Sequence, residues 1–148
     1  MPKITARNNT NRIIDANINR VKEGLRVCEE ITRFILDDRR ATATLKKIRH
    51  DIDAVVRRLP GSPAQFIQAR NSPGDVGRDI YVNELKRNDT RDIFFANIQR
   101  AKESVRVLEE FSKLSAKNTA KDFKKIRYGI YEAEKKIVKK IPALYYHR

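Results

Sequence analysis

Residues 16–30 read Ala-Asn-Ile-Asn-Arg-Val-Lys-Glu-Gly-Leu-Arg-Val-Cys-Glu-Glu, and residues 96–110 read Ala-Asn-Ile-Gln-Arg-Ala-Lys-Glu-Ser-Val-Arg-Val-Leu-Glu-Glu. Ten of these fifteen pairs are identical at a shift of 80 positions. A second match follows each stretch after a slip of two residues, with Lys-Lys-Ile-Arg-His at 46–50 and Lys-Lys-Ile-Arg-Tyr at 124–128. We therefore expect two copies of one helical hairpin.

Helix signals surround both copies. In the first copy, apolar residues recur at helical spacing, which is typical of a helix with one buried face. These residues are Ile14, Ile18, Val21, Leu25, Cys28 and Ile35. Long helices are predicted over about 9–36, 37–59, 89–114 and 118–142, and a short one over 62–70. The candidate caps of the long helices are Asn9 or Thr10, Asp37 or Asp38, Asp89 or Thr90, and Asn118, and Ser62-Pro63 opens the short one. Residues 71–77 are predicted as a loop, and residues 78–87 leave a short strand and a helical turn open.

These elements predict an all-α fold in a single domain over residues 1–148. Repeat 1 covers about 12–59, a connector about 60–89, and repeat 2 about 90–140. The two antiparallel hairpins would form one helical bundle, related by a pseudo-twofold axis.

The composition favours an anionic partner. The 148 residues include 33 Lys and Arg against 19 Asp and Glu, a formal net charge of +14. Such a surplus attracts nucleic acid, acidic lipid or phosphorylated metabolites. The lone Cys28 excludes an intramolecular disulfide framework and is expected to pack in the core. No apolar run approaches the ~20 residues of a membrane span and the N-terminus lacks a signal-peptide pattern, so we expect a cytoplasmic protein.

Polar residues at the edge of the apolar stripe form the first candidate site. Asn17, Arg20 and Glu23 continue round the helix from that edge. The second copy repeats them as Asn97, Arg100 and Glu103. Asn is a poor residue for the middle of a helix, and a half-buried amide needs partners, for which Arg and Glu one turn away are the nearest candidates. A binding cleft, a buried network between the copies and a surface ladder of ion pairs all stay open.

Arg26 and Arg106 lie farther toward solvent. Each is spaced to pair with a glutamate one turn on, Glu30 or Glu110, in an ordinary ladder of i,i+4 pairs.

The connector holds the second candidate site. Arg70 is followed by the loop Pro73-Gly-Asp-Val-Gly77. Gly74 and Gly77 permit close backbone approach, and Asp75 offers hard oxygens to Mg²⁺. Pro-Gly-Asp also forms ordinary turns, so that alternative stays open. His50 is a further candidate, although a lone helical His is more often structural.

The sequence lacks the phosphate-binding P-loop, the dinucleotide fingerprint and the His-Glu-x-x-His zinc motif. Nothing suggests a nucleophilic triad, and two His with one Cys supply little for proton shuttling or zinc binding. The abundant groups are Arg and Lys with carboxylates, which bind phosphates and Mg²⁺.

An ordered set of short motifs resembles one known family. In chain order they are Asp15-Ala-Asn-Ile-Asn-Arg20 with Glu23-Gly-Leu-Arg-Val27, Arg49-His50, Ala69-Arg70 with Gly74-Asp-Val-Gly77, Ala96-Asn97 with Arg100, Arg106-Val-Leu-Glu-Glu110, and Arg127-Tyr128 with Tyr131. Over about residues 12–140 they resemble the small all-helical hydroxymethylpyrimidine-phosphate kinase of thiamine biosynthesis. That domain occurs alone or fused ahead of thiamine-phosphate synthase, and is often catalogued under the synthase's name. Asn71 and Arg78 depart from the family pattern, in which Asp and Thr are common.

The resemblance implies transfer of the γ-phosphate of ATP, with Mg²⁺ as cofactor, to 4-amino-2-methyl-5-hydroxymethylpyrimidine monophosphate. The acceptor is a phosphate that is mostly ionised at neutral pH, so no general base is required. Arginines and Mg²⁺ can supply charge neutralisation and alignment. Thiamine-phosphate synthase would be the pathway partner. No membrane or nucleic-acid partner is expected, and a homodimer is left open.

Three groups of site residues follow from these motifs. The expected catalytic residues are Arg20, Arg100, Glu23, Glu103 and Asp75. The expected substrate- and nucleotide-binding residues are Asn17, Asn97, Arg26, Arg106, Arg49, His50, Arg70, Gly74 and Gly77. The expected metal ligands are Glu30, Glu110 and Asp75.

Two other functions compete with the kinase. The isoelectric point of about 10.2 favours a basic helical nucleic-acid-binding protein. Against that function, aromatic residues make up 7% of the chain and glutamates interleave the Arg clusters. The other competitor is a non-catalytic partner domain of thiamine-phosphate synthase.

Overall fold

The computed structural model describes residues 3–79 and 85–141. Its helices are α1 (Lys3–Phe34), α2 (Arg39–Val56), α3 (Pro63–Gln68), α5 (Thr90–Ser112) and α6 (Lys117–Val138). Within those two ranges there is no strand, which confirms the predicted all-helical fold. None of the described helices is long and apolar enough to cross a membrane.

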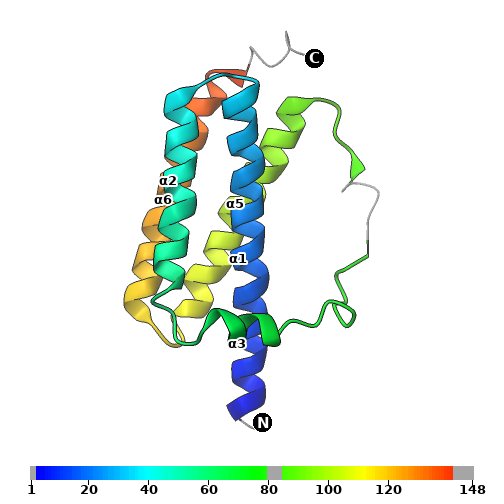
Figure 1. Ribbon diagram of the computed structural model, residues 1–148, viewed down its shortest axis with the longest axis vertical. Coiled ribbons are helices and arrows are strands. Elements are labelled where there is room, and N and C mark those ends of the chain that lie inside the picture. Colours follow the sequence, from blue (N-terminus) through cyan, green and yellow to red (C-terminus); the bar gives the residue numbers. More distant parts are fainter. Residues whose placement is uncertain (1–2, 80–84, 142–148) are drawn as a thin grey trace.

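The four long helices form a bundle of two layers (Figure 1). One layer is the antiparallel hairpin of α1 and α2, and the other is that of α5 and α6. Between the layers, α1 packs on α5 and α2 packs on α6, while α3 lies across α1. The described parts of the connector from α3 to α5, residues 69–79 and 85–89, lie on the side of the bundle opposite α2 and α6 (Figure 1).

The hydrophobic core lies between the two layers. Every member of the predicted apolar stripe on α1 is buried or packs against the core. The thiol of Cys28 is fully buried and donates to the carbonyl oxygen of Phe94 at 3.7 Å. Burial raises the pKa of the Cys28 thiol to about 12. Cys28 is thus a core residue, as predicted.

Side-chain caps begin α2, α3 and α5 as predicted. Asp38, Ser62 and Asp89 each accept a hydrogen bond from the backbone N–H three residues on. The other two predicted starts are wrong. α1 continues back to Lys3 because nothing between there and Thr10 stops a helix, and α6 begins at Lys117, one residue before the expected Asn118 cap. Residues 80–84, part of the stretch left open between strand and turn, lie outside the described residues.

Gly24 sets the closest approach of α1 and α5. A Cβ at this position would lie 2.8 Å from the carbonyl oxygen of Asn97 and 3.5 Å from the amide nitrogen of Ala101. Those are backbone atoms, which cannot rotate away as a side chain would. The glycine therefore allows the two helices to touch at this point.

The two hairpins form matching contacts. The hydroxyl of Thr32 donates to the carbonyl oxygen of Glu29 at 3.0 Å, and that of Ser112 donates to Glu109 at 3.1 Å. These residues are related by the same shift of 80 positions as the helical stretches. Two copies of one hairpin would form such contacts, and the duplication stays an interpretation of the sequence.

Candidate functional site

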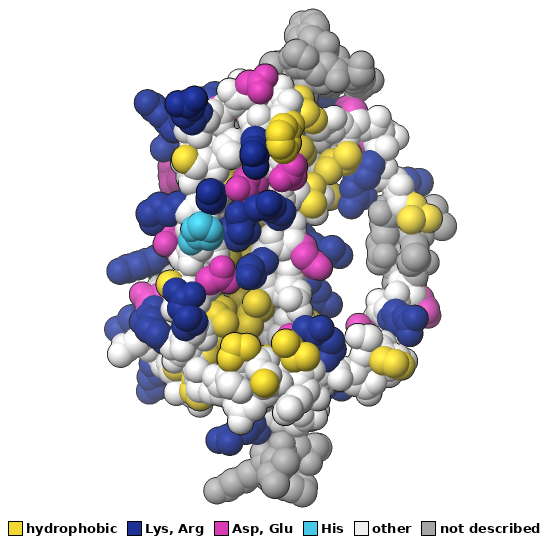
Figure 2. All heavy atoms as spheres, in the orientation of Figure 1, with side chains coloured by type: hydrophobic (Ala, Val, Ile, Leu, Met, Phe, Trp, Pro, Cys, Tyr) yellow, Lys and Arg dark blue, Asp and Glu magenta, His cyan; other side chains and the backbone are white. Residues whose placement is uncertain are grey.

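A cavity of about 720 Å³ lies beside the α1–α5 contact, within the size range of small-molecule sites. Figure 2 shows an opening between the helix bundle and the connector, at the right of the view. The cavity is lined by Asn17, Arg20, Gly77, Arg87, Ala96, Asn97, Gln99, Arg100, Glu103, Ser104 and Val107. Residues from both hairpins and from the connector thus surround one space.

Helix periodicity explains why the repeated residues meet there. Asn17 and Arg20 are three positions apart on α1, as are Asn97 and Arg100 on α5, so each pair lies on one helix face. The two helices are antiparallel and touch at Gly24. Both polar faces therefore lie at the same side of the contact, and the structure places the four residues around the same cavity.

The two Asn amides have a different partner from the one expected. Nδ2 of Asn17 donates to the carbonyl oxygen of Ile13 at 2.8 Å, and Nδ2 of Asn97 donates to that of Ile93 at 2.8 Å. The expectation that Arg or Glu side chains would satisfy these amides is wrong, because the carbonyl one turn back on the same helix is closer. No described residue donates to either Oδ1 atom.

The lining of the cavity is positively charged. Three arginines and one glutamate contribute to it. Arg20 and Arg100 are exposed and pair with no acid among the described residues, while Glu103 accepts a hydrogen bond from Nε2 of Gln99 at 3.0 Å. Guanidinium groups without a protein carboxylate can form charge-assisted, bidentate hydrogen bonds with phosphate. The cavity is therefore suited to phosphorylated ligands.

Arg70 joins the connector to α1. Its Nε and Nη2 donate to the two carboxylate oxygens of Asp15, at 2.8 and 2.9 Å. Asp15 is 7% exposed, and its hydrogen bond raises the pKa of Arg70. The guanidinium is thus held by α1 and Arg70 does not line the cavity, and its expected role in substrate binding stays a prediction.

The loop after Arg70 closes on itself. The backbone N–H of Gly74 donates to Oδ1 of Asn71 at 3.1 Å, and that of Gly77 donates to Oδ1 of Asp75 at 2.9 Å. These are side-chain-stabilised turns, the alternative that the sequence left open. Of the expected site residues in this loop, Gly77 lines the cavity, whereas Gly74 and Asp75 do not.

The sequence profile of the ThiD2 family matches residues 12–136, a range that contains both hairpins and the connector. The chain belongs to the ThiD2 family. This finding confirms the family resemblance drawn from the ordered motifs.

Relatives of this ThiD2 chain include several proteins named thiamine-phosphate synthase. The one from Rhodopirellula baltica is 38% identical over 134 residues, which are 90% of this chain and 35% of that protein. Those from Nostoc punctiforme and Synechocystis sp. are 35% and 37% identical and are covered over 35% and 34% of their lengths. The chain thus spans about a third of the curated relatives it matches. No solved structure matches the chain at a significant level.

Several residues expected in the site lie instead in an ion-pair cluster between α1 and α2. Glu29, whose side chain is 5% exposed, pairs with Arg49 at 3.1 Å and with Arg26 at 3.8 Å. Arg26 also pairs with Glu30 at 3.6 Å, as the ladder alternative predicts. Neither these residues nor the adjacent, exposed His50 line the cavity.

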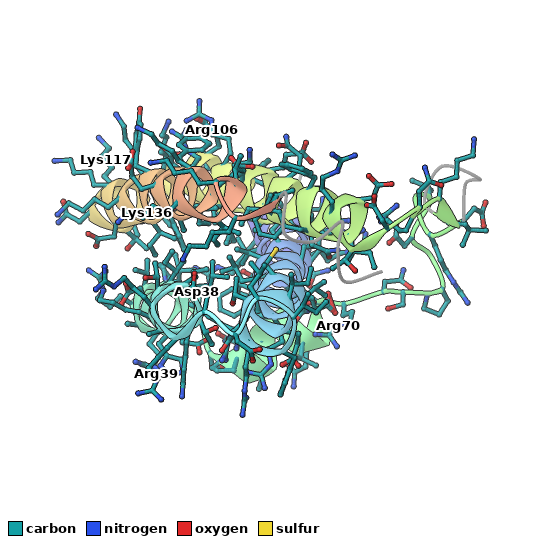
Figure 3. The ribbon with its side chains drawn as sticks, turned by 90° about the horizontal axis from the view of Figure 1, so that it is seen from above. Asp38, Arg39, Arg70, Arg106, Lys117 and Lys136 are labelled. Carbon is teal, nitrogen blue, oxygen red and sulfur yellow. The ribbon has the colours of Figure 1, made fainter. Side chains whose placement is uncertain are left out.

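A matching cluster lies between α5 and α6. Glu109, also 5% exposed in its side chain, pairs with Arg127 at 2.9 Å and with Arg106 at 3.3 Å. Arg106 pairs with Glu110 at 2.9 Å. Figure 3 shows Arg106 on the side of α5 that faces away from α1 and α2. In this ThiD2 chain, Arg26, Arg49, Arg106 and their glutamates thus stabilise helix pairs outside the cavity.

The structure does not bring the expected metal ligands together. Glu30 and Glu110 each pair with an arginine of their own hairpin. A hydrogen bond from Lys113 is the main cause that lowers the pKa of Glu110. Among the described residues, no three His, Cys, Asp or Glu side chains form a group that could hold a metal ion. Glu23, expected to be catalytic, is exposed and does not line the cavity, whereas Glu103 does.

Sequence reasoning missed three carboxylates that organise this part of the fold. Asp15, Glu29 and Glu109 are each at most 7% exposed and each accept bonds from an arginine distant in sequence. A usable signal was present, because all three lie next to apolar positions of α1 or α5. A carboxylate at such a position is rarely buried without a partner.

Proposed function

We propose that this chain acts in thiamine biosynthesis as a kinase that phosphorylates 4-amino-2-methyl-5-hydroxymethylpyrimidine monophosphate with ATP. The single observation that carries the proposal is the cavity at the contact of the two hairpins, to which each hairpin contributes one Asn and one Arg. ThiD2-family membership and relatives named thiamine-phosphate synthase support the pathway.

The arginines of the cavity fit phosphoryl transfer between two phosphates. An oxygen of the acceptor phosphate attacks the γ-phosphorus, a new P–O bond forms, and the bond to the ADP oxygen breaks. The attacking oxygen is already deprotonated at neutral pH, so no side chain has to remove a proton. Catalysis then consists of alignment and neutralisation of the charge on the transferred group, for which Arg20 and Arg100 are suitably placed.

The asparagines fit the heterocycle. Asn17 and Asn97 each present an Oδ1 atom that accepts no hydrogen bond from any described residue. Such an oxygen can accept from the 4-amino group of the pyrimidine. Because Nδ2 of each amide is held by its own helix, the orientation of the amide is fixed before the substrate binds.

Mg²⁺ is the expected cofactor, and one carboxylate of the cavity fits it. Glu103 lines the cavity, and Mg²⁺ is commonly held by one or two carboxylates together with substrate phosphates and water. When bound, the ion would neutralise charge on the phosphates of ATP. Glu30 and Glu110 are not part of this proposal, because each already pairs with an arginine of the same helix.

A kinase assay on the purified protein tests the proposal. The protein is incubated with ATP, Mg²⁺ and one of two acceptors, the pyrimidine monophosphate or the free alcohol. Anion exchange then separates the diphosphate and monophosphate products. We expect turnover of the monophosphate and little or none of the alcohol, which lacks the phosphate that the arginines would bind and carries a weakly acidic hydroxyl. Arg57→Ala, an exposed arginine of the turn after α2, is the matched control for arginine variants of the cavity. Equal turnover of both acceptors would contradict the role of the arginines. Turnover of neither would favour a non-catalytic partner domain.

A further inference from the structure

An exposed stripe of lysines and tyrosines runs along α6. Its members follow one another at steps of three or four residues, so they lie on one face of the helix. They are Lys117, Lys121, Lys124, Tyr128, Tyr131 and Lys135, and all six are exposed. At 1.5 Å per residue the stripe is about 27 Å long. Figure 3 shows its first member, Lys117, on the side of α6 away from α1 and α2.

The stripe contains no carboxylate, although α6 has three acidic residues in total. Asp122 pairs with Arg58 of the turn after α2, and Glu134 pairs with Lys102 of α5, so both are directed toward neighbouring segments. Folding thus directs two of the three acids away from the lysines, while the third, Glu132, is exposed beside Tyr131 at the edge of the stripe. That interleaving argued against a nucleic-acid partner at the level of sequence, and on this face it is reduced to one exposed acid against four lysines.

Tyr128 and Tyr131 form an ordered aromatic pair in the middle of the stripe. Their side chains are 54% and 38% exposed, and their rings meet edge to face with centroids 5.7 Å apart and an interplanar angle of 79°. The guanidinium carbon of Arg127 lies 5.3 and 5.8 Å from the two ring centroids. Arg127 donates to the hydroxyl of Tyr131 at 3.2 Å and is itself held by Glu109. The rings are therefore oriented in the absence of any ligand.

We propose that this stripe binds single-stranded nucleic acid, as a function separate from the kinase. Lysines along a helix attract a phosphate backbone, and exposed aromatic rings stack bases without requiring a particular sequence. The two rings are nearly perpendicular, with Arg127 over both and Lys102 over that of Tyr131, so bases would stack on the exposed parts of the two rings and be splayed apart. A surface for a purely acidic protein would need the lysines but not the tyrosines, and a small metabolite would not span the stripe.

The corresponding face of α2 provides a matched comparison. A shift of 78 positions places Arg39, Ala43, Lys46, His50, Asp53 and Arg57 where α6 has its stripe. That face has no Phe, Tyr or Trp, and its Asp53 forms an ion pair with Lys22 at 2.8 Å. We therefore expect nucleic acid to bind at α6 and not at α2.

Fluorescence anisotropy with a labelled oligouridine of about 20 nucleotides tests the proposal, since binding sites of single-strand-binding folds cover roughly 4–16 nucleotides. We expect Lys121→Glu with Lys124→Glu to weaken binding at least tenfold and to reduce its salt dependence. Tyr128→Ala with Tyr131→Ala should weaken binding about tenfold without changing the salt dependence. The same charge reversal at Lys46 and Arg57 should change binding less than threefold.

Three results would overturn the proposal. They are absence of binding at 50 mM salt, equal loss in the α2 control, and full affinity in the tyrosine variant. Full affinity without tyrosines would mean that the stripe binds any polyanion, which inorganic polyphosphate as a second probe would show directly. Kinase turnover is measured on the same variants and should be unchanged, so failure of the proposed kinase function and failure of this proposal are distinguishable. Unchanged helical circular dichroism shows that each variant is folded.

Discussion

The α1–α2 hairpin and the α5–α6 hairpin share a sequence pattern but not an environment. Both place a buried glutamate between two arginines, and both turn an Asn and an Arg toward the common cavity. The connector is present once and contributes Gly77 and Arg87 to that cavity. The two helices are also unequal, because α5 lines the cavity with more residues than α1 does. Two hairpins of similar sequence can thus supply paired residues, while the segment between them gives the two members of each pair different surroundings.

That inequality suits a reaction between two different phosphates. Identical halves with identical surroundings would bind the donor and the acceptor equally well. Here Glu103 lines the cavity and its counterpart Glu23 does not. Substitutions at matched positions of the two hairpins distinguish the positions that are equivalent from those that differ.

The largest effect is expected at the arginine pair. Arg20→Ala and Arg100→Ala should each lower kcat/KM for the pyrimidine monophosphate by about 10²-fold or more, the typical effect of losing one charged transition-state contact. Neither residue pairs with a described acid, so neither variant should change the melting temperature appreciably. Steady-state kinetics with Arg57→Ala as control checks this. Full activity in one of the two variants would show that a single hairpin does the chemistry.

The next effect concerns the two buried glutamates and should be equal in both hairpins. Glu29→Gln and Glu109→Gln each leave two arginines facing a neutral amide, one of them nearly buried. Losing hydrogen bonds to charged groups should cost roughly 2–3 kcal/mol of unfolding free energy in each case. Urea unfolding followed by circular dichroism measures both values. A difference of more than about 1 kcal/mol would show that the two clusters are not energetic equivalents.

The sequence predicted the parts of the fold that depend on local pattern. Helical spacing identified the core face of α1, and candidate caps at 37–38, 62 and 89–90 identified three helix starts. The partners of polar groups depended instead on the tertiary arrangement. For Arg70, no local pattern in the sequence indicated that Asp15, which is 55 residues away, accepts two of its hydrogen bonds. The same holds for Arg49, whose partner Glu29 is twenty residues away.

A smaller effect should separate the two glutamates at the cavity. Glu103→Gln should lower kcat/KM by about tenfold or more, because a carboxylate that lines the cavity can contact Mg²⁺. A tenfold loss in rate corresponds to about 1.4 kcal/mol of transition-state stabilisation. Glu23→Gln should change it less than twofold, since this side chain is exposed and does not line the cavity. Titration of Mg²⁺ in the kinase assay separates a metal contact from a structural effect. Equal losses in both variants would contradict the asymmetry.

Gly24 and Ser104 occupy matched positions at the contact of α1 and α5. Gly24→Ala places a methyl group 2.8 Å from the carbonyl oxygen of Asn97, which should cost about 1–2 kcal/mol after the better helix propensity of Ala is counted. Ser104→Ala removes a hydroxyl that donates to the carbonyl oxygen of Arg100, a bond within its own helix. Its effect should therefore stay within about 0.5 kcal/mol. Urea unfolding of both variants checks this, and equal stability would show that the helices can separate freely at this point.

The smallest effect concerns the helix starts that differ between the hairpins. Asp38 caps α2, whereas its counterpart Ala116 precedes α6 with φ −150° and ψ 79° and makes no side-chain cap bond. Ala116→Asp should stabilise the protein, and Asp38→Ala should destabilise it, each by about 1 kcal/mol. Hydrogen bonds from the backbone N–H of Ala41 and then from Lys140 lower the pKa of Asp38 in the folded protein. The contribution of Asp38 to the stability of the fold is therefore complete above the unfolded pKa near 4, and it is lost as pH falls through the folded pKa. Thermal melts at pH 7 and pH 3 should show that Asp38→Ala destabilises the protein less at the lower pH. Equal destabilisation at both pH values would mean that the charge of the carboxylate is not what caps α2.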